Sequence, residues 1–224
     1  MKRRSVADLL NVPDPAWPLV QSWIRDAKVD VEALPPTSGK RETALEAMQI
    51  TVRSPMGAVT YESGGLLIDH GFLRVLGCGH VKLPRSLPEW NRSRGDGFFL
   101  IADDVVGGFF AGDSGAFGGK AGEIHYFAPD TLRWEPLNGM GYSEFLQWSL
   151  SGKLVTFYQD MRWPNWEKEC ALIRGDQALS IWPPLWSKEG KDISKASRKH
   201  VSIEEVYNLN VNEFPSQLNS TEEI

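Results

Sequence analysis

Residues 98–134 read FFLIADDVVGGFFAGDSGAFGGKAGEIHYFAPDTLRW. Runs rich in Phe, Ile and Tyr lie on both sides of Asp103-Asp104, and a second pair of such runs lies on both sides of Pro129-Asp130. Aromatic and β-branched residues favour strands, whereas Asp, Gly and Pro favour the turns between them. The pattern therefore predicts two successive β-hairpins, and hence an antiparallel sheet.

Helices are predicted on both sides of these hairpins. Upstream, helices should begin at Asp14-Pro15 and Ser54-Pro55, because Asp and Ser accept amide hydrogens of a first turn and Pro lacks one of those donors. Downstream, Ser143 is predicted to cap a helix. Further helices are predicted at 153–162, at 166–175 and after Ser202, strands at 66–68 and 72–76, and either type at 43–53. The predicted fold class is α+β: a twisted antiparallel sheet covered by helices, with additional C-terminal helices.

The helix predicted after Ser143 carries an apolar stripe that has to be buried against one face of the sheet. The expected cluster consists of Trp148, Phe145, Phe99 and Ile101.

Breaks in the pattern divide the chain into three segments. Residues 34–39, LPPTSG, are typical of a linker. We therefore expect an N-terminal helix and linker at 1–39, an α+β domain at 40–152, and a Trp-rich helical extension at 153–224 that packs on the same body. Within the extension, residues 188–200 are predicted as a solvated connection and residues 217–224 as a frayed polar end.

Composition and charge exclude several classes of protein. With 42% hydrophobic residues and 9 Trp among 224 residues, the chain is neither mainly disordered nor fibrous. Its net charge of −5 argues against nucleic acid as a partner. No run approaches the roughly 20 apolar residues of a membrane span, so no membrane partner is expected. Asp8 and Asn11 interrupt the apolar part that a signal peptide would need after MKRRS, and a cytoplasmic location is expected.

Residues that could hold a metal or a cofactor are few. Cys78 and Cys170 are far apart without metal-ligand spacing and are predicted to be reduced, buried thiols, with a single disulfide as the alternative. Histidines at 70, 80, 125 and 200 lack the helical spacing of a zinc site. The glycines of 107–119 match neither a P-loop nor a dinucleotide motif. No metal and no cofactor are expected.

Gly112-Asp113-Ser114-Gly115 matches the GDSG sequence around the nucleophile of trypsin-like proteases. His80, one of the two aspartates 103 and 104, and Ser114 also occur in that family's His, Asp, Ser order. The histidine context differs, however, and helical spacing at both termini argues against a double β-barrel. We therefore predict a glycine-rich hairpin loop and assign no catalytic residue.

Charge is unevenly distributed along the chain. Residues 96–150 carry eight acidic residues against Lys120 and Arg133, a net charge of −6 that exceeds the −5 of the whole chain. A localised negative field attracts basic partners. On this basis we predict a partner-binding site formed by exposed carboxylates in the hairpin region, namely Asp103, Asp104, Asp113 and Glu123. Because adjacent strand residues point to opposite faces, Asp103 and Asp104 are not expected to act on one substrate.

Several of these motifs together resemble the SUKH superfamily, whose domains occur in yeast cell-wall regulators and bacterial toxin-immunity proteins. The resemblance covers roughly residues 43–152 and depends on short motifs. Glu62-Ser63 replaces the family's Asn before Gly64-Gly65, and the region from 153 onward has no counterpart. The matching runs are Phe98–Asp104, Gly107–Phe110, Ile124–Phe127 and Tyr142–Leu146. The whole chain is also compatible with a bacterial family catalogued only as a domain of unknown function.

The resemblance implies helices packed on a strongly twisted antiparallel sheet and a protein-binding role without catalysis. In the immunity branch, the domain neutralises a polymorphic toxin, frequently a basic nuclease, by binding it. The expected function is therefore that of a non-catalytic, cytoplasmic protein-interaction domain, in the immunity branch one that binds a basic toxin. The alternative is a small-molecule or glycan-processing enzyme whose site lies in the Trp-rich C-terminal half, where Trp163, Trp166, Trp182 and Trp186 could stack on sugar rings.

Overall fold

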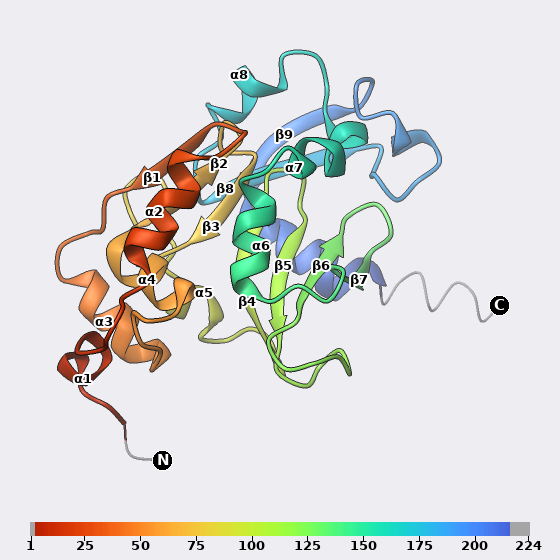
Figure 1. Cartoon of the computed structure of the whole chain (residues 1–224). Helices are drawn as coiled ribbons and strands as arrows, with labels where there is room; N and C mark the ends of the chain where they lie inside the picture. The colour runs from red at the N-terminus through yellow and green to blue at the C-terminus, as the bar shows by residue number, and fades with distance from the viewer. Residues whose placement is uncertain (1–2, 216–224) are drawn as a thin grey trace.

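The computed structural model describes residues 3–215. Seven strands form one antiparallel sheet in which every strand pairs with its neighbours in sequence (Figure 1). They are β1 (Val31–Leu34), β2 (Gly65–Ile68), β3 (Leu73–Leu76), β4 (Phe98–Asp104), β5 (Phe109–Asp113), β6 (Ile124–Ala128) and β7 (Arg133–Pro136). The two predicted hairpins are the pairs β4–β5 and β6–β7. The predicted α+β fold class is confirmed.

The first hairpin reverses later than predicted. Asp103 and Asp104 are the last residues of β4, and Val105–Gly108 make the reversal. Gly107 has a φ of 93°, a conformation that favours glycine. The side chain of Asp104 fixes this turn, because its Oδ1 atom accepts hydrogen bonds from the backbone amides of Val106 and Gly108 at 3.1 and 2.8 Å.

Helices surround the sheet in the order α1 (Val6–Leu10), α2 (Trp17–Arg25), α3 (Lys40–Met48), α4 (Pro55–Glu62), α5 (Leu87–Asn91), α6 (Tyr142–Ser149), α7 (Lys153–Phe157), α8 (Trp166–Cys170) and α9 (Ile203–Tyr207). Further helical segments are η1 (Gln159–Met161), η2 (Glu189–Lys191) and η3 (Asn208–Glu213). The ambiguous residues 43–53 therefore contain the end of a helix. None of the helices within residues 3–215 is long and apolar enough to cross a membrane.

Of the helix starts predicted at Asp14, Ser54, Ser143 and Ser202, two are confirmed as side-chain caps. Ser54 Oγ accepts from the amide of Gly57 at 3.0 Å, and Ser202 Oγ accepts from the amide of Glu204 at 3.2 Å. The caps predicted at Asp14 and Ser143 are wrong, since the residues that precede the two helices are Ala16 and Gly141. At the start of α6, the side chain of Glu144, in the first turn of the helix, accepts a hydrogen bond from the amide of Gly141 at 2.7 Å.

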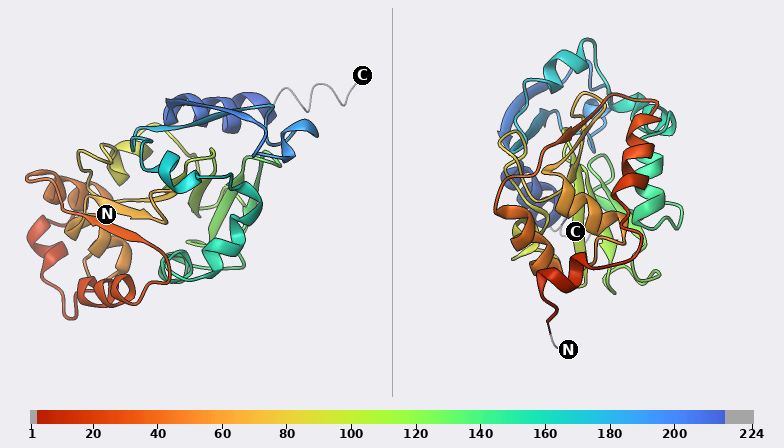
Figure 2. Two further views of the ribbon diagram at one scale, coloured as in Figure 1. Left: turned by 90° about the horizontal axis from the view of Figure 1, so that it is seen from above. Right: turned by 60° about the vertical axis from the view of Figure 1, so that its left-hand side comes forward.

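Both faces of the sheet are covered, as two neighbouring residues of β5 show. Phe109 packs against Tyr207 of α9, with ring centroids 5.0 Å apart, and Phe110 packs against Phe145 of α6 at the same distance. Because successive residues of a strand point to opposite faces, α6 and α9 lie on opposite sides of the sheet (Figure 2). Every residue of β5 and β6 is buried as a result, which explains why their sequences do not alternate between polar and apolar residues.

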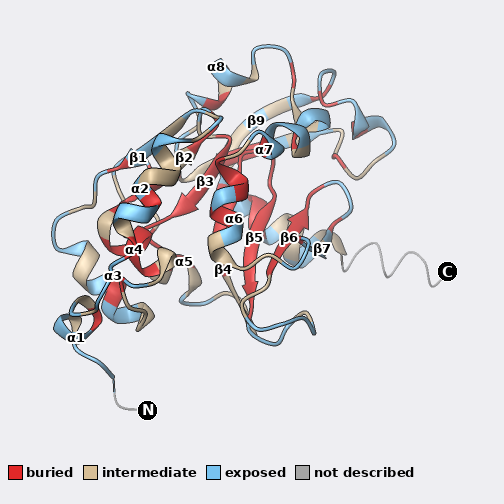
Figure 3. Ribbon diagram, viewed as in Figure 1, coloured by how far each residue is buried: buried red, intermediate tan, exposed pale blue. Residues whose placement is uncertain are grey.

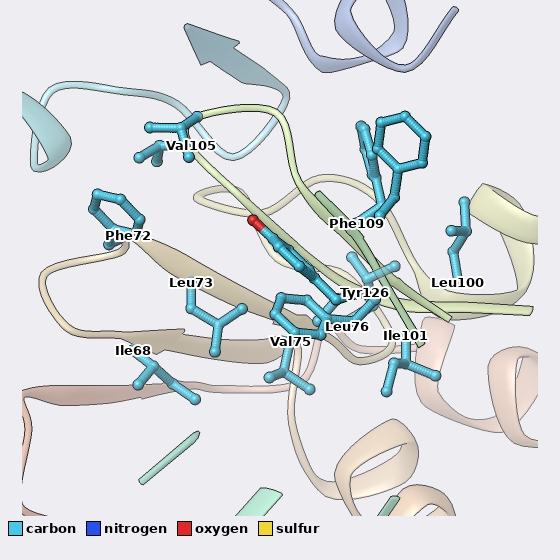
Figure 4. Packing of buried hydrophobic residues seen from close by; sticks show 14 of the residues in the cluster. Ile68, Phe72, Leu73, Val75, Leu76, Leu100, Ile101, Val105, Phe109 and Tyr126 are labelled. Carbon is cyan, nitrogen blue, oxygen red and sulfur yellow. The ribbon is translucent and has the colours of Figure 1, made fainter. Parts of the chain in front are cut away.

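The core extends through all three predicted segments. One cluster of buried side chains contains residues from Val20 to Tyr207, and strands β3 to β6 run through its centre (Figure 3). Figure 4 shows Ile68, Val75, Phe109 and Tyr126 contributing to it from four strands. The boundary predicted after residue 39 is crossed by the sheet itself, because β1 pairs with β2 along its whole length. The polar end predicted at 217–224 lies outside the described residues.

A second, two-stranded sheet is formed by β8 (Gln177–Trp182) and β9 (Ser197–Ser202). The amide of Leu179 donates to the carbonyl of Val105 at 2.8 Å, which attaches this sheet to the first hairpin. Residues 188–200, predicted as a solvated connection, thus include η2 and most of β9. Strand β9 was not predicted because its charged side chains give no alternation of polar and apolar residues.

The predicted aromatic cluster forms with one exchange of residues. Trp148, Phe145 and Ile101 are buried, but Phe99 is half-buried, with its ring packed over Gly112 on the neighbouring strand. Phe110 takes its place in the cluster, with its ring centroid 6.2 Å from that of Trp148.

Candidate functional site

Asp103, predicted to be an exposed partner-binding residue, is completely buried between two arginines. Its Oδ1 lies 2.6 Å from Arg74, which is itself buried, and its Oδ2 lies 2.6 Å from Arg85. Arg85 also donates two hydrogen bonds to the carbonyl of Gly175, at 3.0 and 2.8 Å. The carboxylate therefore holds two cations that attach the segment before β8 to the main sheet, and its role is structural.

Asp104 is buried on the opposite face of β4, as the alternation of a strand requires. Its Oδ2 accepts from the hydroxyl groups of Tyr126 and Tyr158 at 2.8 and 2.9 Å, in addition to the two amides of the hairpin turn. Burial raises the pKa of Asp104 and also raises the pKa of both tyrosines well above their usual value. All four donors come from the protein itself, so this carboxylate is not available to a partner.

Asp113 and Glu123 organise the glycine-rich loop between β5 and β6. Asp113, buried, accepts from the amides of Gly115, Phe117 and Gly119 at 2.7, 3.2 and 3.0 Å. Glu123, half-buried, accepts from an amide of the same loop. Three of the four predicted site residues are thus inside the protein, and the expectation that they form an exposed acidic surface is wrong. The sequence did contain a signal for this structural role, because Asp side chains next to Gly-rich turns commonly accept hydrogen bonds from backbone amides.

The hydrogen bonds to Asp113 make the stability of the loop depend on pH. These hydrogen bonds lower the pKa of Asp113, and the one from the amide of Gly115 has the largest effect. A lowered pKa in the folded state stabilises the protein above the pKa of the unfolded chain, about 3.9, and this contribution is lost as the pH falls through the lower folded value. We expect Asp113→Asn to be less stable than wild type in urea titrations at pH 7, with a difference that shrinks below about pH 4. An equal difference at pH 7 and pH 3 would contradict this.

The protease-like residues do not assemble into a triad. Ser114 is exposed in the irregular loop that follows β5, and its hydroxyl has no hydrogen bond to a histidine among residues 3–215. His80 accepts from the amide of Lys82 at 3.2 Å, and His125 packs on Phe117 with ring centroids 4.5 Å apart. The prediction of a loop holds for Ser114 and Gly115, whereas Gly112 and Asp113 are the last residues of β5.

Both cysteines are buried and free, as predicted. Burial raises the pKa of the Cys170 thiol to about 12, so it is protonated at neutral pH. Within residues 3–215, no group of three or more His, Cys, Asp or Glu side chains is arranged to hold a metal ion.

The tryptophans predicted as a stacking platform separate into two places. Trp163 is buried, and Trp166 carries the guanidinium of Arg162 on its ring at 4.3 Å. Trp182 and Trp186 lie elsewhere, at the end of β8, where the Trp182 side chain is 70% exposed. Of the four, Trp182 alone is exposed, whereas Trp166 and Trp186 are half-buried against the core.

We call the surface around Trp182 and Trp186 the aromatic groove and define it by Trp182, Pro183, Pro184, Trp186 and Phe214. It consists of two adjoining hollows of about 460 and 120 Å³, which share four of these residues. Phe214 reaches the groove from the C-terminal helical turn and packs edge-on against Trp186, with ring centroids 5.9 Å apart. The indole N–H of Trp186 has no acceptor among the described residues. The groove is concave, open to solvent and mostly apolar, and Glu189 is the charged residue that lines it.

A larger cavity, of about 570 Å³, lies between the β1–β3 part of the sheet and residues 170–175. Exposed aliphatic side chains, Val81 and Leu172, line it. Most of its charged groups are paired within the protein at 2.6 Å: Lys82 with Glu32, Arg74 with Asp103, and Arg174 with Asp176. Asp30 lies 3.9 Å from His70. A ligand would find few free polar partners there.

The fold and these surfaces define an α+β protein built on seven sequentially paired strands, with an open aromatic groove beside a small second sheet. The family described as "Protein of unknown function DUF2625" matches residues 6–206, and the chain belongs to this family. It is 44% identical over 211 residues to the uncharacterized protein YbfG of Escherichia coli (strain K12), covering 92% of this chain and 95% of that protein. An uncharacterized protein of Haemophilus influenzae is 36% identical over 214 residues, covering 92% and 93% of the two chains. No solved structure matches the chain.

Proposed function

We propose that this protein is a non-catalytic protein-interaction domain that binds its partner through the aromatic groove. The observation that carries the proposal is the exposed indole of Trp182 beside Pro183 and Pro184. Tryptophan is enriched among the residues that contribute most to protein–protein binding, because it buries a large apolar area at little cost in side-chain freedom. Exposed apolar patches of this kind commonly mark interaction sites.

Two other regions are weaker candidates for the interface. The acidic hairpins are a weak candidate for binding a basic partner. Asp103, Asp104 and Asp113 are buried, and their carboxylates are already bound by groups of the protein itself. In the larger cavity, most of the charged side chains are already paired. The groove, by contrast, presents aromatic surface that nothing in residues 3–215 covers.

The resemblance to the SUKH superfamily supports the same class of function. Domains of that superfamily bind other proteins, and a twisted antiparallel sheet covered by helices is the fold that the resemblance implies. We include in the proposal the cytoplasmic location and the toxin-immunity role of that superfamily's bacterial branch. A polymorphic toxin encoded beside this gene would be the first partner to test.

Site-specific photo-cross-linking tests the proposal. We expect benzoylphenylalanine at position 182 to form a discrete adduct with one other protein in the native host. The matched control carries benzoylphenylalanine at position 172 instead, because Leu172 is 73% exposed but lies away from the groove. Denaturing gels and mass spectrometry of the adducts provide the measurement. Identical adducts from both positions, or none from position 182, would contradict the proposal.

A further inference from the structure

Lysines without ion-pair partners lie in the two segments next to the aromatic groove, η2 and β9. Residues 188–200 carry five cations against Glu189 and Asp192, although the whole chain has a net charge of −5. Lys195 is paired with Asp192, N to O, at 2.7 Å. Arg198 is paired with a carboxylate of α8 at 3.3 Å. The three remaining cations are exposed and form no ion pair within residues 3–215; they are Lys188, Lys191 and Lys199.

The η2 turn holds two of these lysines beside the groove. The hydroxyl of Ser187 donates to the carbonyl of Pro184 at 2.7 Å, and the amide of Gly190 donates to the Ser187 hydroxyl oxygen at 3.0 Å. The backbone of Gly190 is so close to Pro184 that a Cβ atom at this position would lie 1.9 Å from the proline carbonyl oxygen. This close approach fixes the backbone of η2, in which Glu189 lines the groove and Lys188 and Lys191 are the residues on either side of the Glu189-Gly190 pair.

The third lysine reaches the groove from β9. Lys199 pairs with Ser180 in the β8–β9 ladder, and Ser197 pairs with Trp182. Residues two apart in a strand share a face, so Lys199 lies on the same face of the small sheet as Trp182. Unpaired lysines of η2 and of β9 thus lie in the two segments next to the open indole.

From this juxtaposition we infer that the groove binds an extended, acidic segment of the partner protein. An aromatic or aliphatic side chain of that segment packs against Trp182, and its carboxylates face Lys188, Lys191 and Lys199. The inference rests on the proposed function and specifies the chemistry of the partner. Complementary charge selects the partner and speeds its association, while the aromatic contact supplies the apolar burial.

A peptide selection tests the inference with the full chain. A phage library of random twelve-residue peptides is selected on the immobilised protein and depleted on the Trp182→Ser variant. We expect the enriched peptides to carry net negative charge and at least one aromatic or large aliphatic residue. Enriched peptides that are neutral or basic would overturn the inference and leave the proposed function standing. Failure to enrich any peptide above the Trp182→Ser background would overturn both.

Charge-reversal variants then measure the contribution of the lysines. Combined Lys188→Glu, Lys191→Glu and Lys199→Glu should weaken binding of an enriched acidic peptide at least about tenfold at low salt. The loss should become much smaller near 1 M salt, where the screening length is about 3 Å. Lys40→Glu is the matched control, because Lys40 is an exposed lysine at the start of α3, and it should leave binding unchanged. An equal loss from the control, or a loss independent of salt, would overturn the inference.

Discussion

Replacing Asp103 with Asn is expected to lower the free energy of unfolding by about 3–5 kcal/mol. The variant leaves Arg74 and Arg85 without their shared counter-ion, and Arg74 is completely buried. An uncompensated charge inside a protein is costly because the interior does not replace the lost solvation. Arg74 and Arg85 also donate to carbonyls at 174–177, so the contacts between the main sheet and the segment before β8 should weaken together.

Chemical denaturation in urea provides the measurement. The matched control is Asp26→Asn, which removes a carboxylate paired with Arg25 at 4.0 Å where both side chains are exposed. Exposed pairs contribute little, so the control should have the stability of wild type. If Asp103→Asn costs less than about 1 kcal/mol, the carboxylate does not hold the two arginines in the way the contacts indicate.

Truncating Trp148 to Ala is expected to cost about 3–5 kcal/mol. The indole is buried between the sheet and α7, with ring centroids 5.1 Å from Phe157 and 6.0 Å from Phe145. Its removal leaves a cavity that the surrounding rings cannot fill without moving. Thermal or urea unfolding monitored by circular dichroism gives the change.

Trp182→Ala is the matched control, because the chemical change is the same at a side chain that is 70% exposed. It should leave stability within about ±0.5 kcal/mol of wild type. A loss below about 1 kcal/mol at Trp148 would mean that its ring is dispensable to the core. A large loss at Trp182 would mean that the groove is a structural element, and it would weaken its assignment as an interface.

Local sequence signals were sufficient for the central hairpins and for some helix starts. Aromatic runs separated by Asp, Gly and Pro predicted β4 to β7, because turn chemistry and strand propensity act over a few neighbouring residues. Ser54 and Ser202 predicted helix starts for the same reason, since each cap accepts an amide two or three residues further on. Alternation along β4 also predicted correctly that Asp103 and Asp104 address different faces.

Tertiary structure alone decided strands β1 and β9 and the burial of the aspartates. Strands β1 and β9 have no strong propensity of their own and exist through pairing with β2 and β8. Asp103 is buried because Arg74 and Arg85 come from other parts of the chain to compensate its charge, which no local pattern reveals. Composition likewise indicated a Trp-rich second half, but most of its rings face the core. Trp182 stays exposed because no other part of the described fold covers its ring. Residues that are distant in sequence, Phe214 and those of η2, form the groove around it.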